Sequence, residues 1–180
     1  YASGGLYSNP SEMGQIARML LNGGAVDGVR ILRAESVLKM ARDQTLSQPR
    51  QPVILPDGWG LGWDGVRQGG LDAVGIKAWH KGGDTTIYGS EFFVLPDEGL
   101  ALMITGTSPP YGREGLAELI LISALIERHT LAALPPVLPA PHPAEATPTQ
   151  DQLDAMTGIF AYHEGLINII ADHNHTLSMQ

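Results

Sequence analysis

Residues 90–105, SEFFVLPDEGLALMIT, contain two apolar runs separated by the turn sequence Pro96-Asp97-Glu98-Gly99. Proline at the start of the turn and glycine at its end favour a four-residue connection between antiparallel strands. Both runs, 90–95 and 100–105, are almost entirely apolar. We therefore expect this hairpin to lie at the centre of a sheet that is covered on both faces.

The segments on either side of the hairpin supply helices that can cover it. Asn9-Pro10-Ser11-Glu12 has the N-cap, the first-turn proline and the reaching-back glutamate of a helix start. Further helices are expected from Glu35 to Arg42 and, with an amphipathic face, from about Arg113 to Leu131. Strands are expected over 58–63 and 76–80. The predicted fold class is α/β (α+β), an antiparallel sheet flanked by helices.

The composition changes after this region. Six prolines fall between Pro135 and Pro148, which is typical of a semi-rigid extended linker. The predicted organisation is a domain over 1–134, a linker over 135–150 and, over 151–180, the start of a β-rich domain. In that last segment 153–160 and 165–170 form the first hairpin. No segment is apolar for long enough to span a bilayer.

Charge and cysteine content exclude several kinds of function. The formal net charge is −8, and no cluster of Lys or Arg overrides it, so nucleic-acid binding is disfavoured. The chain has no cysteine, which excludes disulfides, thiol chemistry and Cys-ligated zinc.

The run Trp79-His80-Lys81-Gly82-Gly83-Asp84 combines the residue types expected at a strand edge that faces a substrate. Glycines at an edge let a ligand approach backbone N–H groups closely, and a histidine can donate, accept or carry a proton near neutral pH. The run has no nucleophile. Taken alone, His80 is better explained as a half-buried histidine at a strand end that is hydrogen-bonded to backbone.

Several segments together resemble the serine β-lactamase-like hydrolases, a family of class C β-lactamases, D-alanyl-D-alanine peptidases, D-aminopeptidases and esterases. They run in the family's order: SGGLYS at 3–8, ARMLLNGG at 17–24, DGVRIL at 27–32, WGLGW at 59–63 and HKG at 80–82. Residues 1 to about 132 are similar to the C-terminal part of the catalytic domain. Residues 151–180 resemble the start of the small β-barrel domain that follows it in some members. By this resemblance the fold is an incomplete β-lactamase/transpeptidase-like domain.

The resemblance implies roles for the glycine-rich edge. His80 would act electrostatically at the substrate cleft, and the backbone N–H of Gly83 would be an oxyanion donor. Gly82 would keep the edge clear. Lys81 and Gly82 are the residues that the resemblance places against the substrate. Strand alternation suggests that Lys81 points away from the cleft, and Asp84 is expected in a turn.

By the same resemblance the nucleophilic Ser-x-x-Lys and the Tyr-x-Asn loop lie upstream of Tyr1. Two segments inside the chain fit these motif patterns but are weak candidates: Ser36-Val37-Leu38-Lys39 fits Ser-x-x-Lys, and Tyr7-Ser8-Asn9 fits Tyr-x-Asn. Both fall in segments that match non-catalytic parts of the family, and their order is reversed. Asn9 is better explained as a helix cap.

No metal or cofactor is implied. His163, His173 and His175, with Asp172, could form a metal site, but polar residues are expected in such a hairpin turn. The three tryptophans are more typical of sheet packing than of a binding platform.

The sequence therefore predicts part of a serine hydrolase that acts through an acyl-enzyme on amide, β-lactam, D-amino-acid peptide or ester substrates. The nucleophile would lie outside this chain, which alone would be inactive. The expected partners are a small-molecule or peptide substrate and the N-terminal part of the same protein. The alternative is a non-catalytic, truncated or degenerate module with a binding or structural role. The resemblance points to a periplasmic or extracellular location.

Overall fold

A computed structural model describes residues 4–45, 58–85, 87–107, 112–135, 148–162, 165–172 and 176–179, without the side chain of residue 162. Contacts between Cα atoms divide the chain into two compact units, Tyr1–Pro136 and Val137–Gln180. Each unit is described by itself below. Of the linker predicted over 135–150, residues 136–147 lie outside the described residues.

The first unit is built on a three-stranded antiparallel sheet of β3 (Trp79–Asp84), β4 (Gly89–Leu95) and β5 (Leu100–Gly106). The strand order is β3-β4-β5, so β4 is central and almost completely buried. In the β4–β5 pair Leu95 lies opposite Leu100, which confirms the predicted hairpin.

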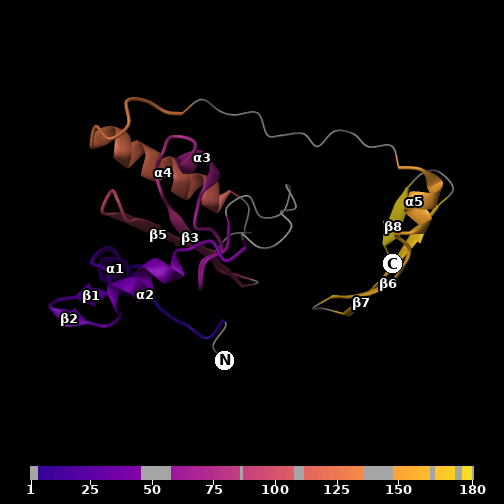
Figure 1. The fold of residues 1–180 in the computed structure, drawn as a ribbon, viewed down its shortest axis with the longest axis horizontal. Helices are drawn as coiled ribbons and strands as arrows, with labels where there is room; N and C mark the ends of the chain where they lie inside the picture. Colours follow the sequence, from indigo (N-terminus) through magenta and orange to yellow (C-terminus); the bar gives the residue numbers. More distant parts are fainter. Residues whose placement is uncertain are drawn as a thin grey trace. The chain divides into compact units, whose positions relative to one another are not determined.

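Helices lie on both faces of this sheet (Figure 1). One face packs against α3 (Gly69–Asp72) and α4 (Arg113–Glu127), in a core that includes Phe93 and Leu95. The other face packs against α1 (Pro10–Leu21) and α2 (Ala34–Met40), in a core that includes Phe92 and Val94. Successive side chains of β4 thus enter opposite cores, as the two-residue period of a strand requires. The predicted antiparallel sheet flanked by helices is confirmed.

Local sequence signals set the start of α1. The Asn9 side chain accepts a hydrogen bond from the Glu12 N–H at 3.0 Å, so the predicted cap is confirmed. The Glu12 carboxylate accepts from the Ser8 hydroxyl at 3.0 Å. After the helix, the short strands β1 (Ala25–Val26) and β2 (Val29–Arg30) form a hairpin.

Gly24 joins α1 to this hairpin in a conformation that only glycine adopts freely. Its φ is +96°, and a Cβ built there would collide with the carbonyl of Leu32. We expect Gly24→Ala to lower the free energy of unfolding by about 1–3 kcal/mol, measured by urea denaturation. Gly28, at φ +80° with open space around it, is the matched control. An equal cost for Gly28→Ala would contradict the steric explanation.

Four elements differ from the sequence predictions. Residues 58–63 do not form a strand, because Gly58 and Gly62 have φ of +64° and +84° and turn the backbone. The strand expected over 76–80 begins only at Trp79 and continues to Asp84. The helices expected to reach Arg42 and Leu131 end at Met40 and Glu127.

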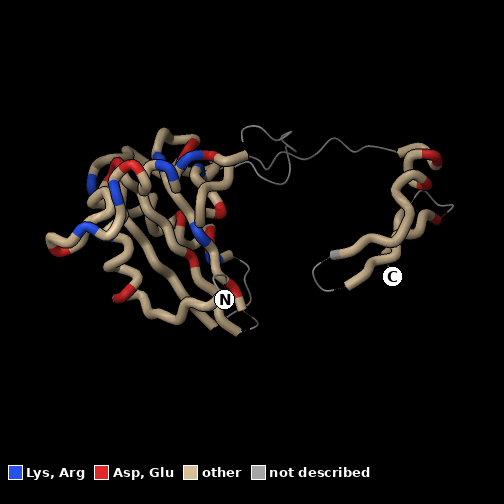
Figure 2. The backbone as a smooth tube through the Cα atoms, turned by 60° about the horizontal axis from the view of Figure 1, so that its bottom comes forward, with Lys and Arg blue, Asp and Glu red and all other residues tan. Residues whose placement is uncertain are grey.

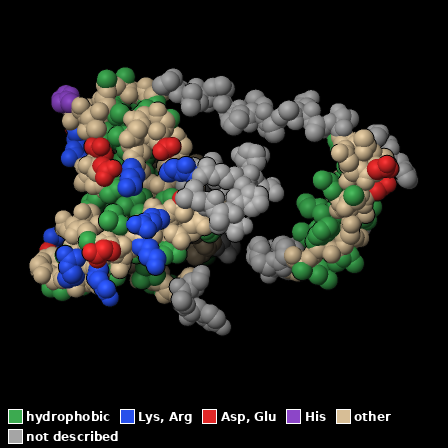
Figure 3. Space-filling model, viewed as in Figure 1, with side chains coloured by type: hydrophobic (Ala, Val, Ile, Leu, Met, Phe, Trp, Pro, Cys, Tyr) green, Lys and Arg blue, Asp and Glu red, His purple; other side chains and the backbone are tan. Residues whose placement is uncertain are grey.

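The second unit contains α5 (Gln150–Asp154), β6 (Gly158–Tyr162), β7 (Gly165–Ala171) and β8 (Leu177–Met179). Its antiparallel strands have the order β6-β7-β8, one strand more than the predicted hairpin. Hydrophobic side chains are prominent on the face seen in Figure 3, and Ile159, Leu166 and Met179 are each at least 70% exposed.

Within the described ranges, no helix combines the length and the apolar character that crossing a bilayer requires.

Candidate functional site at the open edge of β3

β3 is an edge strand of the sheet, and its outer side carries polar backbone groups that β4 does not pair. The N–H of His80 donates outward to the Gly65 carbonyl at 2.8 Å, and the N–H of Gly82 donates outward to Asp64 Oδ2 at 2.9 Å. Alternation along the strand places the N–H of Asp84 on the same outer side. Lys81 and Gly83 point their backbone groups toward β4.

The Asp64 carboxylate closes part of this edge. One oxygen, Oδ2, accepts from the Gly82 N–H at 2.9 Å and from Lys81 Nζ at 2.8 Å. The Lys81 ammonium also contacts the Gly82 carbonyl. The backbone bridge between Gly65 and His80 places Asp64 beside β3. The N–H of Asp64 itself donates to the His80 carbonyl at 2.9 Å. The carboxylate thus lies between a strand-edge N–H and an ammonium.

His80 lies on the α4 side of the sheet, and its ring is largely buried. Nε2 of His80 and Oε2 of Glu91 are 2.6 Å apart, and their side chains are 12% and 8% exposed. The ring also stacks on Phe93 with centroids 4.6 Å apart. These contacts fix the position of the imidazole on the α4 side of β3, and Nε2 is hydrogen-bonded to Glu91.

The surroundings of His80 favour its protonated form. Burial lowers the pKa of His80, but the hydrogen bond to Glu91 and the charges of Glu114, Glu91 and Asp64 outweigh it. The pKa of His80 is therefore above its usual value of 6.5. At pH 6 the His80 ring is therefore mainly protonated.

Asp84 is the last residue of β3, not the turn residue that the sequence analysis expected. Its carboxylate binds the guanidinium of Arg113, the first residue of α4. Arg113 is buried, and its guanidinium fills the space above Gly89, where a side chain would collide with it. The contact ties the end of β3 to the start of α4.

The N–H predicted as the oxyanion donor is that of Gly83, but in the structure this N–H points toward β4 and not to the open edge. Gly83 is paired with Ser90 on β4, and its carbonyl accepts from the Ser90 hydroxyl at 3.1 Å. The N–H groups of its two neighbours, Gly82 and Asp84, lie on the outer side, and that of Gly82 is already bonded to Asp64. Shifting by one residue in a strand reverses the direction of the backbone groups, so the geometry favours Asp84 over Gly83 at the open edge.

The serine, lysine and tyrosine of the two motif-like segments lie elsewhere in the first unit. Ser36 is half buried and Lys39 is exposed on α2. Tyr7 is 94% exposed on the N-terminal segment. The predicted metal ligands His163, His173 and His175 lie outside the described residues. Within the described ranges, no group of three or more His, Asp or Glu side chains could hold a metal ion.

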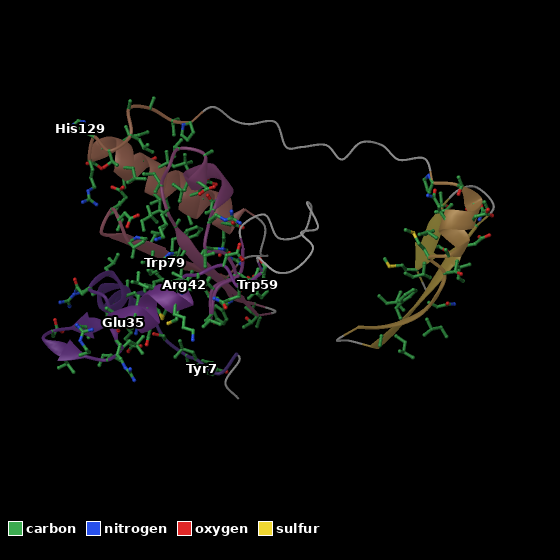
Figure 4. The ribbon with its side chains drawn as sticks, in the orientation of Figure 1. Tyr7, Glu35, Arg42, Trp59, Trp79 and His129 are labelled. Atoms are coloured by element: carbon green, nitrogen blue, oxygen red, sulfur yellow. The ribbon has the colours of Figure 1, made fainter. Side chains whose placement is uncertain are left out.

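Two of the three tryptophans pack in the core. Trp63 and Trp79 are 4% and 2% exposed, and their ring centroids are 5.7 Å apart. Trp79 lies inside the first unit in Figure 4, whereas Trp59 lies at its margin and is 45% exposed. The packing interpretation is therefore confirmed for Trp63 and Trp79.

Sequence reasoning missed the carboxylates and the guanidinium that surround β3. Glu91 had a detectable signal, because it is the one charged residue in the apolar run SEFFVL. An ionisable group in such a run needs a partner. Asp64 and Arg113 had no comparable signal, because a loop and a helix start are ordinary places for a charge.

An α+β domain with an antiparallel sheet, covered by helices and open at β3, is the class that this geometry defines. Residues 1–125 match the family model described as Beta-lactamase. The chain therefore belongs to the beta-lactamase family, which confirms the resemblance seen in the first part of the sequence. The resemblance of residues 151–180 to a following β-barrel domain stays a prediction.

Solved structures share the fold. The structure titled "Crystal structure of SurE" matches with a TM-score of 0.57 and 22% identity, over 96% of this chain and 36% of that chain. "Crystal structure of SurE with D-Leu" matches with a TM-score of 0.50 and 23% identity, over 83% of this chain and 31% of that chain. This chain thus spans about a third of the length of those structures. No curated protein matches it significantly.

Proposed function

We propose that this chain is part of a serine hydrolase that forms an acyl-enzyme with amide, β-lactam, D-amino-acid peptide or ester substrates. The family match over residues 1–125 carries the proposal. The nucleophile would lie outside this chain, and the chain would contribute one wall of the site. Alone it would not turn over substrate.

The open edge of β3 suits the tetrahedral step of this chemistry. Serine attack on a carbonyl carbon places negative charge on the carbonyl oxygen, and a fixed N–H lowers the energy of that charge. The outward N–H of Asp84 is the donor that we favour, and the Arg113 contact fixes its position. Gly82 and Gly83 present no side chain, so a substrate backbone can approach the strand.

His80 and Lys81 would act on different sides of this edge. The Lys81 side chain is 47% exposed and can meet substrate or an attacking group. His80, held by Glu91, would act electrostatically from beneath the strand and keep it in place. The predicted electrostatic role of His80 thus remains our proposal, while contact with the substrate passes to Lys81.

Covalent labelling tests the proposal. We expect a Ser-x-x-Lys followed by Tyr-x-Asn upstream of Tyr1 in the reading frame. The protein expressed from that full frame should then bind a fluorophosphonate probe. Labelling should disappear when the upstream serine is replaced by alanine, because that hydroxyl forms the covalent bond. Ser36→Ala is the matched control and should label normally.

Labelling that survives the upstream Ser→Ala variant would overturn the mechanism. Absence of both motifs upstream would favour the alternative, a non-catalytic module that binds or supports another part of the protein.

A further inference from the structure

Three basic side chains around the open edge of β3 are each paired with a carboxylate. Lys81 is paired with Asp64 at 2.8 Å, His80 with Glu91 at 2.6 Å, and Arg113 with Asp84. A further carboxylate, that of Glu114, acts on His80 through its charge. Figure 2 shows the same interspersion of acidic and basic residues along the rest of the first unit.

Asp64 occupies the place that an acidic substrate group would need. A free carboxylate is best bound by an ammonium together with backbone N–H donors. At this edge the Lys81 ammonium and the Gly82 N–H are such a pair of donors. Both already donate a hydrogen bond to the same oxygen of Asp64, Oδ2. The Asp64 side chain is 35% exposed, so its charge still acts on a group that approaches from solvent.

Two carboxylates lie close to Gly82. A Cβ at this position would lie 3.3 Å from Glu91 Oε2 and 3.6 Å from Asp64 Oδ2. Glu91 is largely buried against His80, whereas the Asp64 side chain is 35% exposed, so Asp64 is the carboxylate that a substrate group would meet at this edge. A substrate carboxylate placed there would meet like charge, which disfavours binding.

We propose that Asp64 determines specificity at this edge: the substrate presents a neutral or cationic group to β3, and not a free carboxylate. This inference rests on the proposed function and narrows its substrate class. Neutral esters and amides, and those with an amine near the scissile bond, fit the edge. β-Lactams and peptides that place a free carboxylate beside Lys81 are selected against.

Two thioesters that differ by one charge test the inference on the protein expressed from the full reading frame. Benzoyl-D-alanyl thioglycolate ends in a carboxylate, and its methyl ester is neutral; both release a thiol that can be titrated. We expect kcat/KM for the methyl ester to exceed that for the acid by at least about tenfold.

Asp64→Asn should remove this preference. The amide oxygen can still accept from the Gly82 N–H, but the variant loses the negative charge and frees Lys81. We expect the ratio of the two kcat/KM values to fall at least about tenfold, mainly through a gain for the acid. Asp27→Asn is the matched control, because Asp27 pairs with Arg18 at 2.6 Å away from β3. It should leave the ratio unchanged.

A wild-type protein that cleaves the acid as well as the methyl ester would overturn the specificity inference and leave the hydrolase proposal standing. So would an Asp64→Asn ratio equal to the wild-type ratio. Cleavage of neither thioester, together with no fluorophosphonate labelling, would overturn both.

Discussion

Replacing Phe93 with alanine is expected to lower the free energy of unfolding of the first unit by about 3–5 kcal/mol. Phe93 is 0% exposed at the middle of β4, in the core formed with α3 and α4. Its truncation leaves a cavity that a central strand, paired on both sides, cannot close. It also removes the ring on which His80 stacks.

Urea denaturation followed by tryptophan fluorescence measures this loss. All three tryptophans lie between residues 59 and 79, so the signal reports on the first unit. Leu119→Ala is the control, because Leu119 is 50% exposed on α4 and its loss should change stability by less than about 1 kcal/mol. Similar losses for the two variants would show that β4 is not at the centre of this core.

Glu91→Gln should lower the pKa of His80 and reverse the pH dependence that the pair gives to stability. In the wild type the His80 pKa is raised above 6.5. Its contribution to stability is therefore complete below pH 6.5 and is lost as the pH rises through the folded-state pKa. With a neutral amide in place of the carboxylate, burial dominates and the pKa falls, so the contribution from His80 increases with rising pH.

We expect the Glu91→Gln variant to lose about 1–3 kcal/mol at pH 6, where the imidazolium would remain without its carboxylate. The loss should be smaller at pH 8, where His80 can become neutral. Titration of the His80 ring protons by NMR, with urea denaturation at both pH values, measures the two effects. Glu114→Gln is the matched control, since Glu114 is exposed and acts on His80 only through charge.

The control should lower the pKa of His80 less than Glu91→Gln does. If the two variants lower it equally, or if Glu91→Gln leaves it unchanged, the 2.6 Å hydrogen bond is not the dominant stabilising contact of the imidazolium.

Much of the fold could be predicted because its signals are local. The 90–105 hairpin followed from two apolar runs around Pro96 and Gly99, and the start of α1 followed from Asn9 and Pro10. The strand expected over 58–63 failed for a related local reason. Alternating glycines fit a strand pattern, but at positive φ they turn the chain instead.

The candidate site could be predicted only in part. The glycine-rich run of β3 indicated an accessible edge, and the structure places that run at the edge of the sheet. Backbone N–H groups along β3 point alternately toward β4 and away from it. Which residues point away depends on which residue of β3 hydrogen-bonds to the preceding loop. The bridge between Gly65 and His80 sets that residue, and it joins positions 15 apart in the sequence. A local pattern does not contain this register.

Short-range signals in the chain were enough to establish the family, the β4–β5 hairpin, the helices that cover it and the glycine-rich edge. Each of these follows from periodicity, turn chemistry or an ordered set of motifs. The expectation that the whole hairpin is central was met by β4 but not by β5, which lies at the other edge of the sheet. Three-dimensional packing was needed to establish that Glu91 holds His80 and that Asp64 accepts hydrogen bonds from Lys81 and the Gly82 N–H. These pairings join residues 11 to 18 positions apart or depend on strand register, so they exist only once β3, β4 and the preceding loop have packed together.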